Sequence, residues 1–140
     1  MQLNHTIYKA RDKYATARFL TDVVGLPEAE SFAKDRFLIH HLDNNVSIDV
    51  GQVDEPFDPE HYAFLVTEAE FDEILARVKE RGIDYYPDPF YDVPGIINNN
   101  DGGRGMYFRD PSGHDLEVMT TPYGEDAASV GRVHTMNNPG

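Results

Sequence analysis

The chain contains no cysteine among its 140 residues. This absence excludes disulfides, thiolate nucleophiles and every zinc or iron–sulfur site that is built on cysteine. A metal ion could be held only by histidine nitrogen and carboxylate oxygen atoms. Because nothing in the cysteine usage indicates an oxidising compartment, we expect a cytoplasmic protein.

Long apolar runs and basic residues are also scarce. No apolar stretch approaches the roughly 20 residues of a membrane-spanning helix, and the first seven residues lack the basic and apolar regions of a secretory signal. Lys and Arg number 12 against 25 Asp and Glu, which gives a formal net charge of -13. So acidic a surface repels phosphates and anionic lipids, and we therefore expect no nucleic-acid or membrane partner.

The residues that are present form a pattern of strands and helices that occurs twice, in a chain long enough for one compact domain. In the first half, strands are expected over 3–10, 29–34, 37–42 and 46–50. A helix follows the first strand, with Asp12 as its N-cap and Gly25 as its C-cap. Its apolar face is expected to comprise Ala15, Phe19, Leu20, Val23 and Val24.

The second half repeats this order after a polar linker over 52–59. Thr67 and Glu70 form a capping box that begins a helix, and Gly82 ends it. The apolar face of this helix contains Phe71, Ile74, Leu75 and Val78. Strands are expected over 61–66, 83–86, 105–109 and 115–119, with a long loop over 87–104.

The two halves align with each other at several points. Phe19 lies 14 residues after His5, as Leu75 lies 14 residues after His61, and SIDV (47–50) matches DLEV (115–118). The repeat predicts an α+β fold of two βαβββ modules that form a curved mixed sheet around a cleft. We assign the modules to about 1–54 and 58–121, within a single domain over 1–121, and a polar tail to 122–140.

Strand alternation places candidate metal ligands on the sheet face that points away from the helices. In three expected strands, apolar residues occupy one face and a ligand-type residue lies on the other. These ligand-type residues are Asp49, His61 and Glu117. His5 shares its face with Leu3 and Ile7, so its place among the ligands depends on the repeat.

At these residues the chain resembles the vicinal oxygen chelate superfamily, which includes glyoxalase I, extradiol dioxygenases, fosfomycin resistance proteins and bleomycin-binding proteins. The resemblance extends nearly to Thr121 and is most specific in its last stretch. It rests on LNHTI (3–7), FLTDVVGL (19–26), HYAFLV (61–66) and YFRDPSGHDLEV (107–118). The paired βαβββ fold of this superfamily agrees with the repeat.

The resemblance implies one divalent metal ion, held at the starts of the first and fifth strands and within the fourth and eighth. Those positions here are His5, His61, Asp49 and Glu117. Glyoxalase I has two His and two Glu, whereas extradiol dioxygenases have two His and one Glu. Asp49 is one methylene shorter than Glu, so we expect it to reach the metal poorly or through water. The ligand types suit nickel, zinc, cobalt, manganese or iron(II) without choosing among them.

A glyoxalase-like lyase or isomerase is the function expected first. The metal would bind two neighbouring oxygens of a small substrate and stabilise an enediolate-like intermediate, and Glu117 would move the proton. An iron(II) extradiol-type dioxygenase is an alternative, ranked lower because the common extradiol enzymes are longer. A bleomycin-type binding protein without catalysis is another, disfavoured because all four ligand positions are filled. Open strand edges and the dimers common among single-domain relatives both favour a homodimer.

The remaining histidines have ordinary structural explanations. His40 and His41 alternate, so one of them faces the cleft, although a polar sheet position explains either. His114 closes a turn and is expected to be structural, and His134 lies in a tail expected to fray or to pack on a partner. The long loop over 87–104 is typical of lids and of flexible segments.

Overall fold

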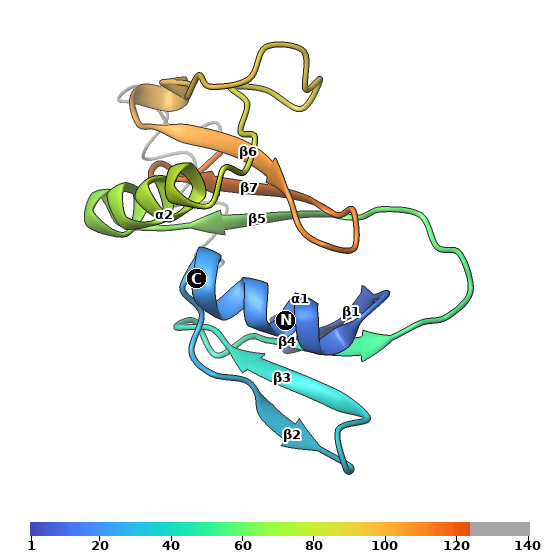
Figure 1. The fold of residues 1–140 in the computed structure, drawn as a ribbon. Helices are drawn as coiled ribbons and strands as arrows, with labels where there is room; N and C mark the ends of the chain where they lie inside the picture. The colour runs from blue at the N-terminus through green and yellow to red at the C-terminus, as the bar shows by residue number, and fades with distance from the viewer. Residues whose placement is uncertain (124–140) are drawn as a thin grey trace. The chain divides into compact units, whose positions relative to one another are not determined.

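Two sheets, each accompanied by one main helix, make up the structure, a computed structural model that describes residues 1–123 (Figure 1). The chain divides into two compact units. Unit 1 is Met1–Glu60 with Arg109–His114, and unit 2 is His61–Phe108 with the chain from Asp115 onward. Most of the tail expected over 122–140 lies outside the described residues. Within the described part, no helix has the length and apolar character needed to cross a membrane.

Unit 1 follows the expected order of one strand, one helix and three strands. The order of strands in its sheet is β1-β4-β3-β2; β1 runs parallel to β4, and β3 is antiparallel to both β4 and β2. Its elements are β1 (His5–Ala10), α1 (Lys13–Phe19), a π-helical segment (Leu20–Val24), β2 (Glu30–Phe32), β3 (Phe37–His41) and β4 (Ser47–Gln52).

The first helix begins and ends where its capping residues predict. The Asp12 carboxylate accepts hydrogen bonds from the first backbone amides, and Gly25 adopts the left-handed conformation at φ 92°. The apolar face is partly wrong, because Ala15 is exposed while Thr16 and Ala17 are buried. Leu20 is fully buried, and helical periodicity places the residues three and four positions before it, not Ala15, on its face.

The turn Arg109–His114 packs within unit 1. The Tyr8 hydroxyl donates to Asp110 at 2.6 Å, and the hydroxyls of Thr16 and Ser112 lie 2.9 Å apart. The fully buried His114 joins two backbone segments. Its Nε2 donates to the Lys9 carbonyl at 2.7 Å, and its Nδ1 accepts from the Glu60 amide at 2.9 Å. The structural role predicted for His114 is confirmed.

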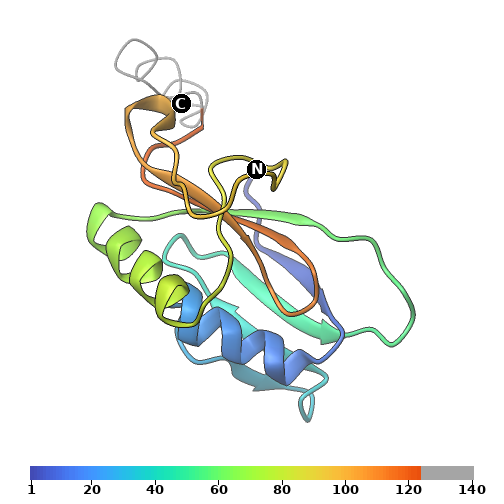
Figure 2. The same cartoon turned by 45° about the horizontal axis from the view of Figure 1, so that its top comes forward.

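Unit 2 has the strand order β5-β7-β6, with β5 parallel to β7 (Figure 2). The capping box of Thr67 and Glu70 is present, and the helix buries Phe71, Ile74 and Val78. Its elements are β5 (His61–Leu65), α2 (Glu68–Glu80), a 3-10 turn (Asn100–Gly102), β6 (Gly105–Arg109) and β7 (Asp115–Met119).

The strand predicted over 83–86 is wrong. Only Tyr86 pairs with β6, through an isolated bridge to Tyr107, and a second bridge joins Asn98 to Gly105. The pairing does not extend back over 83–85, because the Ile83 amide donates to the Val78 carbonyl at the helix end and the Tyr85 carbonyl accepts from the Gly95 amide. The loop that follows returns to β6 at Asn98. The protein is therefore α+β, as predicted, with a second unit one full strand short of βαβββ.

Candidate functional site

His5 lies on the face of the unit 1 sheet that points away from its core. Tyr8 and Ala10 of β1 are fully buried, whereas Ile7 is 54% exposed and His5 is exposed as well. The apolar residues that share a face with His5 therefore do not mark a core face. Alternation, which was ambiguous in the sequence, agrees with the repeat once the burial of Tyr8 is known.

Asp49 lies on the same face of this sheet. Parallel pairing sets Ile7 opposite Asp49 and His5 opposite Ser47, and directly paired residues project to the same side. The Ser47 hydroxyl donates to Asp49 Oδ1 at 3.0 Å. His5 Nδ1 lies 2.7 Å from the amide oxygen of Asn4, which can only accept, so in the neutral imidazole Nδ1 is the donor and Nε2 is the nitrogen with a lone pair.

His61 and Glu117 form the corresponding pair in unit 2. The parallel β5 and β7 strands set His61 opposite Asp115 and Ala63 opposite Glu117. His61 Nε2 lies 3.0 Å from Glu117 Oε2. The side chain of Glu117 is 13% exposed and that of His61 is 48% exposed. A largely covered carboxylate beside an accessible imidazole is a donor set that can bind a divalent cation.

Tyr107 completes this cluster, and the sequence analysis did not select it. Its ring stacks on His61 with centroids 6.0 Å apart and an interplanar angle of 28°. Burial and a hydrogen bond to Glu117 both raise the pKa of the phenol, so it stays protonated and donates to the carboxylate. On β6 the neighbours Met106 and Phe108 are fully buried. Alternation applied to this strand would have placed Tyr107 on the ligand face.

A pocket of about 240 Å³ adjoins the cluster within unit 2. Glu117 and Tyr107 contribute to its lining together with Asn100, Arg104 and Thr121. The bridge between Asn98 and Gly105 carries two backbone hydrogen bonds, of 2.8 and 3.0 Å, and fixes the loop against β6. The end of the long loop, held to β6 at Asn98, therefore forms one side of the pocket.

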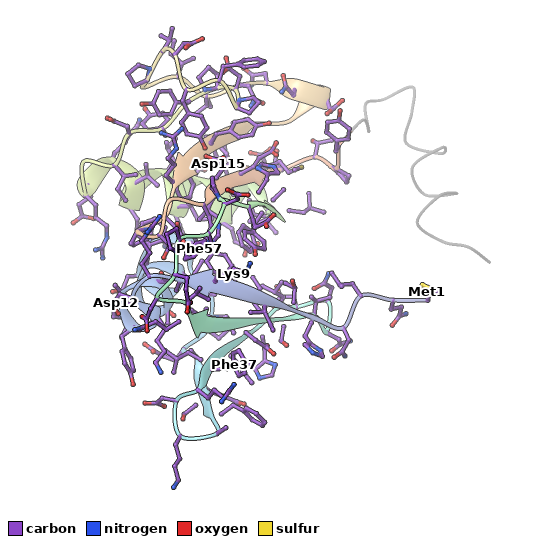
Figure 3. The ribbon with its side chains drawn as sticks, turned by 90° about the vertical axis from the view of Figure 1, so that its right-hand side faces the viewer. Met1, Lys9, Asp12, Phe37, Phe57 and Asp115 are labelled. Atoms are coloured by element: carbon purple, nitrogen blue, oxygen red, sulfur yellow. The ribbon has the colours of Figure 1, made fainter. Side chains whose placement is uncertain are left out.

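A shallower hollow of about 380 Å³ lies in unit 1 between the end of β1 and the segment that follows β4. Figure 3 labels Lys9 and Phe57, which belong to its lining. The guanidinium of Arg11 lies 5.2 Å from the centroid of the Phe57 ring. Asp58 and Glu60 share this lining with Lys9, so acidic and basic groups are mixed there.

The other histidines are placed as their strand positions dictate. His40 is fully buried, and its Nδ1 donates to the Pro27 carbonyl at 3.0 Å. His41 is the one on the uncovered face, where its Nε2 lies 3.2 Å from Glu30. His134 lies outside the described residues. Across residues 1–123, no group of three His, Asp or Glu side chains is close enough to hold a metal ion.

Comparison with known proteins gives three informative relatives; no protein-family model matches the chain. Oxidase ChaP-H1 is 51% identical with a TM-score of 0.84, and the match covers 89% of this chain and 98% of that one. Oxidase ChaP-H2 is 49% identical with a TM-score of 0.84, over 89% and 97%. Metallothiol transferase FosB of Shouchella clausii (strain KSM-K16) is 37% identical over 68 residues, or 49% of this chain. That match spans 42% of FosB, less than half of its length.

An identity of 51% over almost the whole of a related chain establishes a family relationship. The chain belongs to the vicinal oxygen chelate superfamily, as the sequence resemblance implied. Other solved structures match at 18% to 22% identity with TM-scores of 0.61 to 0.64, and they show a shared fold. Together the relatives support a metal-dependent enzyme of this superfamily.

Proposed function

We propose that the protein is a metal-dependent oxidase that uses dioxygen on a small molecule with neighbouring oxygen atoms. The observation that carries this proposal is the 51% identity to a protein named Oxidase ChaP-H1, over 98% of that chain. The lyase or isomerase reaction expected first from the sequence has a named counterpart in lactoylglutathione lyase from Agrobacterium tumefaciens, whose 20% identity shows a shared fold alone. The oxygen-dependent reaction therefore takes first place.

The proposed cofactor is one divalent ion per chain, with nickel, zinc, cobalt, manganese and iron(II) as the candidates. We assign it to His5, His61 and Glu117, with Asp49 as a weaker ligand. The donor atoms fit this role, because His61 Nε2 and Glu117 Oε2 already converge and His5 Nε2 keeps a lone pair. The grouping of His5 with His61 and Glu117 comes from the family resemblance and is part of this proposal. When bound, it would supply Lewis-acid activation of the substrate oxygens.

The side chains around Glu117 orient its carboxylate before any substrate arrives. Tyr107 donates to this carboxylate, and His61 lies within hydrogen-bond distance of the same group. Glu117 also lines the 240 Å³ pocket, so one of its oxygens can face a bound molecule. Such a carboxylate can hold a proton taken from a substrate hydroxyl.

The proposal includes assembly into a homodimer around a small-molecule substrate. Both edges of the unit 1 sheet, β1 and β2, present strands without a neighbour on one side in the described chain. Large apolar residues are exposed on or near these strands, including Leu3 at 67% and Phe32 at 57%. Exposed edges and apolar side chains favour association with a second copy.

Oxygen uptake tests the proposed reaction. Protein loaded anaerobically with each candidate ion is mixed with a panel of catechols and α-hydroxyketones, and dissolved oxygen is followed. We expect uptake with at least one ion, and we expect His61→Ala to lose both the ion and the uptake. Conversion of a panel compound without uptake would support a lyase or isomerase. Tight ligand binding by a protein that retains no metal would support a binding protein.

A further inference from the structure

The pocket beside Glu117 has an unusual charge balance. Among the nine residues that line it, two are acidic, Asp101 and Glu117, and Arg104 is the one cation. The rest are amides, hydroxyl-bearing residues and a methionine. Whether the pocket suits an anion therefore depends on whether the guanidinium of Arg104 is available to a ligand.

The guanidinium of Arg104 is already bound to α2. Its Nε donates to Glu68 at 2.8 Å, one terminal nitrogen lies 2.6 Å from the same carboxylate, and the other lies 2.8 Å from Asp72. A further hydrogen bond reaches the Glu68 carbonyl at 3.2 Å, and the guanidinium lies 4.5 Å from the centroid of the Phe71 ring. Two carboxylates thus more than neutralise the positive charge, and the planar group is held from several sides.

An anionic ligand in this pocket would lose hydration without gaining a free cation. It would also meet the carboxylates of Asp101 and Glu117 on a protein whose net charge is -13. Uncharged hydroxyl groups, in contrast, can bond to amides and hydroxyls of the lining such as Asn100 and Thr121. Because Arg104 is already paired with carboxylates, the pocket favours uncharged ligands over anionic ones.

We propose that the pocket lined by Glu117 and Arg104 binds an uncharged, hydroxyl-bearing part of the substrate and rejects a carboxylate there. This inference rests on the proposed function, because that function makes Glu117 part of the site. It adds the chemical class of the substrate. Glu68 and Asp72 are specificity-determining residues that act through Arg104.

A matched pair of probes tests this proposal, 4-methylcatechol and 3,4-dihydroxybenzoate, which differ by a methyl group in place of a carboxylate. Binding to the full-length protein is measured by calorimetry under nitrogen, so no turnover is needed. We expect the wild type to favour 4-methylcatechol by about tenfold or more, which is ~1.4 kcal/mol. The double variant Glu68→Gln/Asp72→Asn should narrow this preference by a similar factor, because it frees the guanidinium.

The control variant is Glu73→Gln/Glu80→Gln, which removes the same two charges from exposed positions of α2 without touching Arg104. It should leave the preference unchanged. Amide NMR shifts at Asn98 and Asn100 should report the location of 4-methylcatechol. The proposal is overturned if both double variants lose the preference for 4-methylcatechol equally. It is also overturned if the wild type binds 3,4-dihydroxybenzoate more tightly, or if no shifts appear at Asn98 and Asn100. Failure of oxygen uptake, with the preference intact, would count against the oxidase alone.

Discussion

At the scale of single residues, each candidate histidine has a neighbour that decides which nitrogen is available. The side-chain oxygen of Asn4 lies within hydrogen-bond distance of His5 Nδ1, and that of Glu117 lies within hydrogen-bond distance of His61 Nε2. The two carboxylates differ more than the histidines do. Glu117 is largely covered and has Tyr107 and His61 beside it, whereas Asp49 accepts a hydrogen bond from the Ser47 hydroxyl. The longer and better oriented carboxylate is therefore the stronger ligand candidate.

Metal affinity should separate Glu117 from Asp49. Glu117→Ala removes a proposed direct ligand, so its loss of affinity should exceed the roughly 10- to 100-fold typical of losing a residue that only hydrogen-bonds to a ligand. Asp49→Ala should stay within that range, because the shorter side chain reaches less far. Titrations are run at about pH 7.5, above the ordinary histidine pKa of about 6.5, since protonated imidazole cannot ligate.

Glu73→Ala, an exposed change on α2, serves as the control for altered charge in this titration. It should bind metal as the wild type does. If Asp49→Ala loses the ion as completely as Glu117→Ala, the site is a four-ligand cage of the glyoxalase kind. That result would weaken the case for an oxidase.

His40 should make stability depend on pH. Burial lowers its pKa from the ordinary 6.5, against the opposing influence of the Pro27 carbonyl and Glu28. The unfolded chain therefore binds a proton more readily than the folded one. Stability should be complete above about pH 6.5 and should fall by up to about 1.4 kcal/mol per pH unit below it, until the folded pKa is reached.

Urea unfolding at about pH 7.5 and about pH 5.5 measures this effect, since the midpoint reports the free energy of unfolding. His40→Asn keeps an N–H donor near the position that faces Pro27 and cannot be protonated in this range. Its stability should fall less than that of the wild type between the two values. An equal fall in both proteins would show that the pH dependence does not come from His40.

At the scale of elements, local rules predicted most of the fold. Caps at Asp12 and Thr67 fixed two helix starts, and turn residues bounded the strands that the structure confirms. The failures have physical causes. The segment over 83–86 has the composition of a strand, but backbone groups of Ile83 and Tyr85 bond to Val78 and Gly95, so one bridge to β6 is all that forms. Tyr107 was missed because alternation was not extended to β6, although its buried neighbours were readable.

The wall of the unit 2 pocket depends on a glycine that admits no side chain. A Cβ at Gly105 would lie 2.8 Å from Oδ1 and 2.9 Å from Nδ2 of Asn98. Asn98 is held in turn by a 2.8 Å hydrogen bond to the Pro87 carbonyl. Gly105→Ala should therefore destabilise the protein by about 1–3 kcal/mol, as overpacking does.

A double-mutant cycle measured by urea unfolding tests the cause. In an Asn98→Ala background the clash disappears, so Gly105→Ala should cost less there. The coupling should lie within about 0.5–3 kcal/mol for residues in contact. Strictly additive effects would show that the penalty arises elsewhere on β6.

At the scale of the whole molecule, the repeat predicted two units, and the structure gives each its own sheet. Period-two alternation identifies which residues share a face within one sheet. It identified Asp49, His61 and Glu117 as candidates, whereas His5 was added from the internal repeat. Alternation is a property of one strand and its neighbours, so it carries no information on how one pair meets the other. Family resemblance, not periodicity, joined the pairs into one proposed site.

Assembly is the prediction that belongs to this scale. We expect a homodimer, so sedimentation at micromolar concentration should give about twice the 15.9 kDa of one chain. Each copy carries a formal charge of -13, and like charges oppose association. Raising salt from about 0.05 M to about 0.5 M shortens the screening length and should tighten the dimer.

Phe32→Ser removes an apolar ring that is 57% exposed on an edge strand, and it should weaken the dimer in either salt. Glu80→Ser, an exposed change on α2, is the matched control and should leave association nearly unchanged. A monomer in all of these conditions would contradict the prediction, and would require the ligands of any one metal site to come from a single chain.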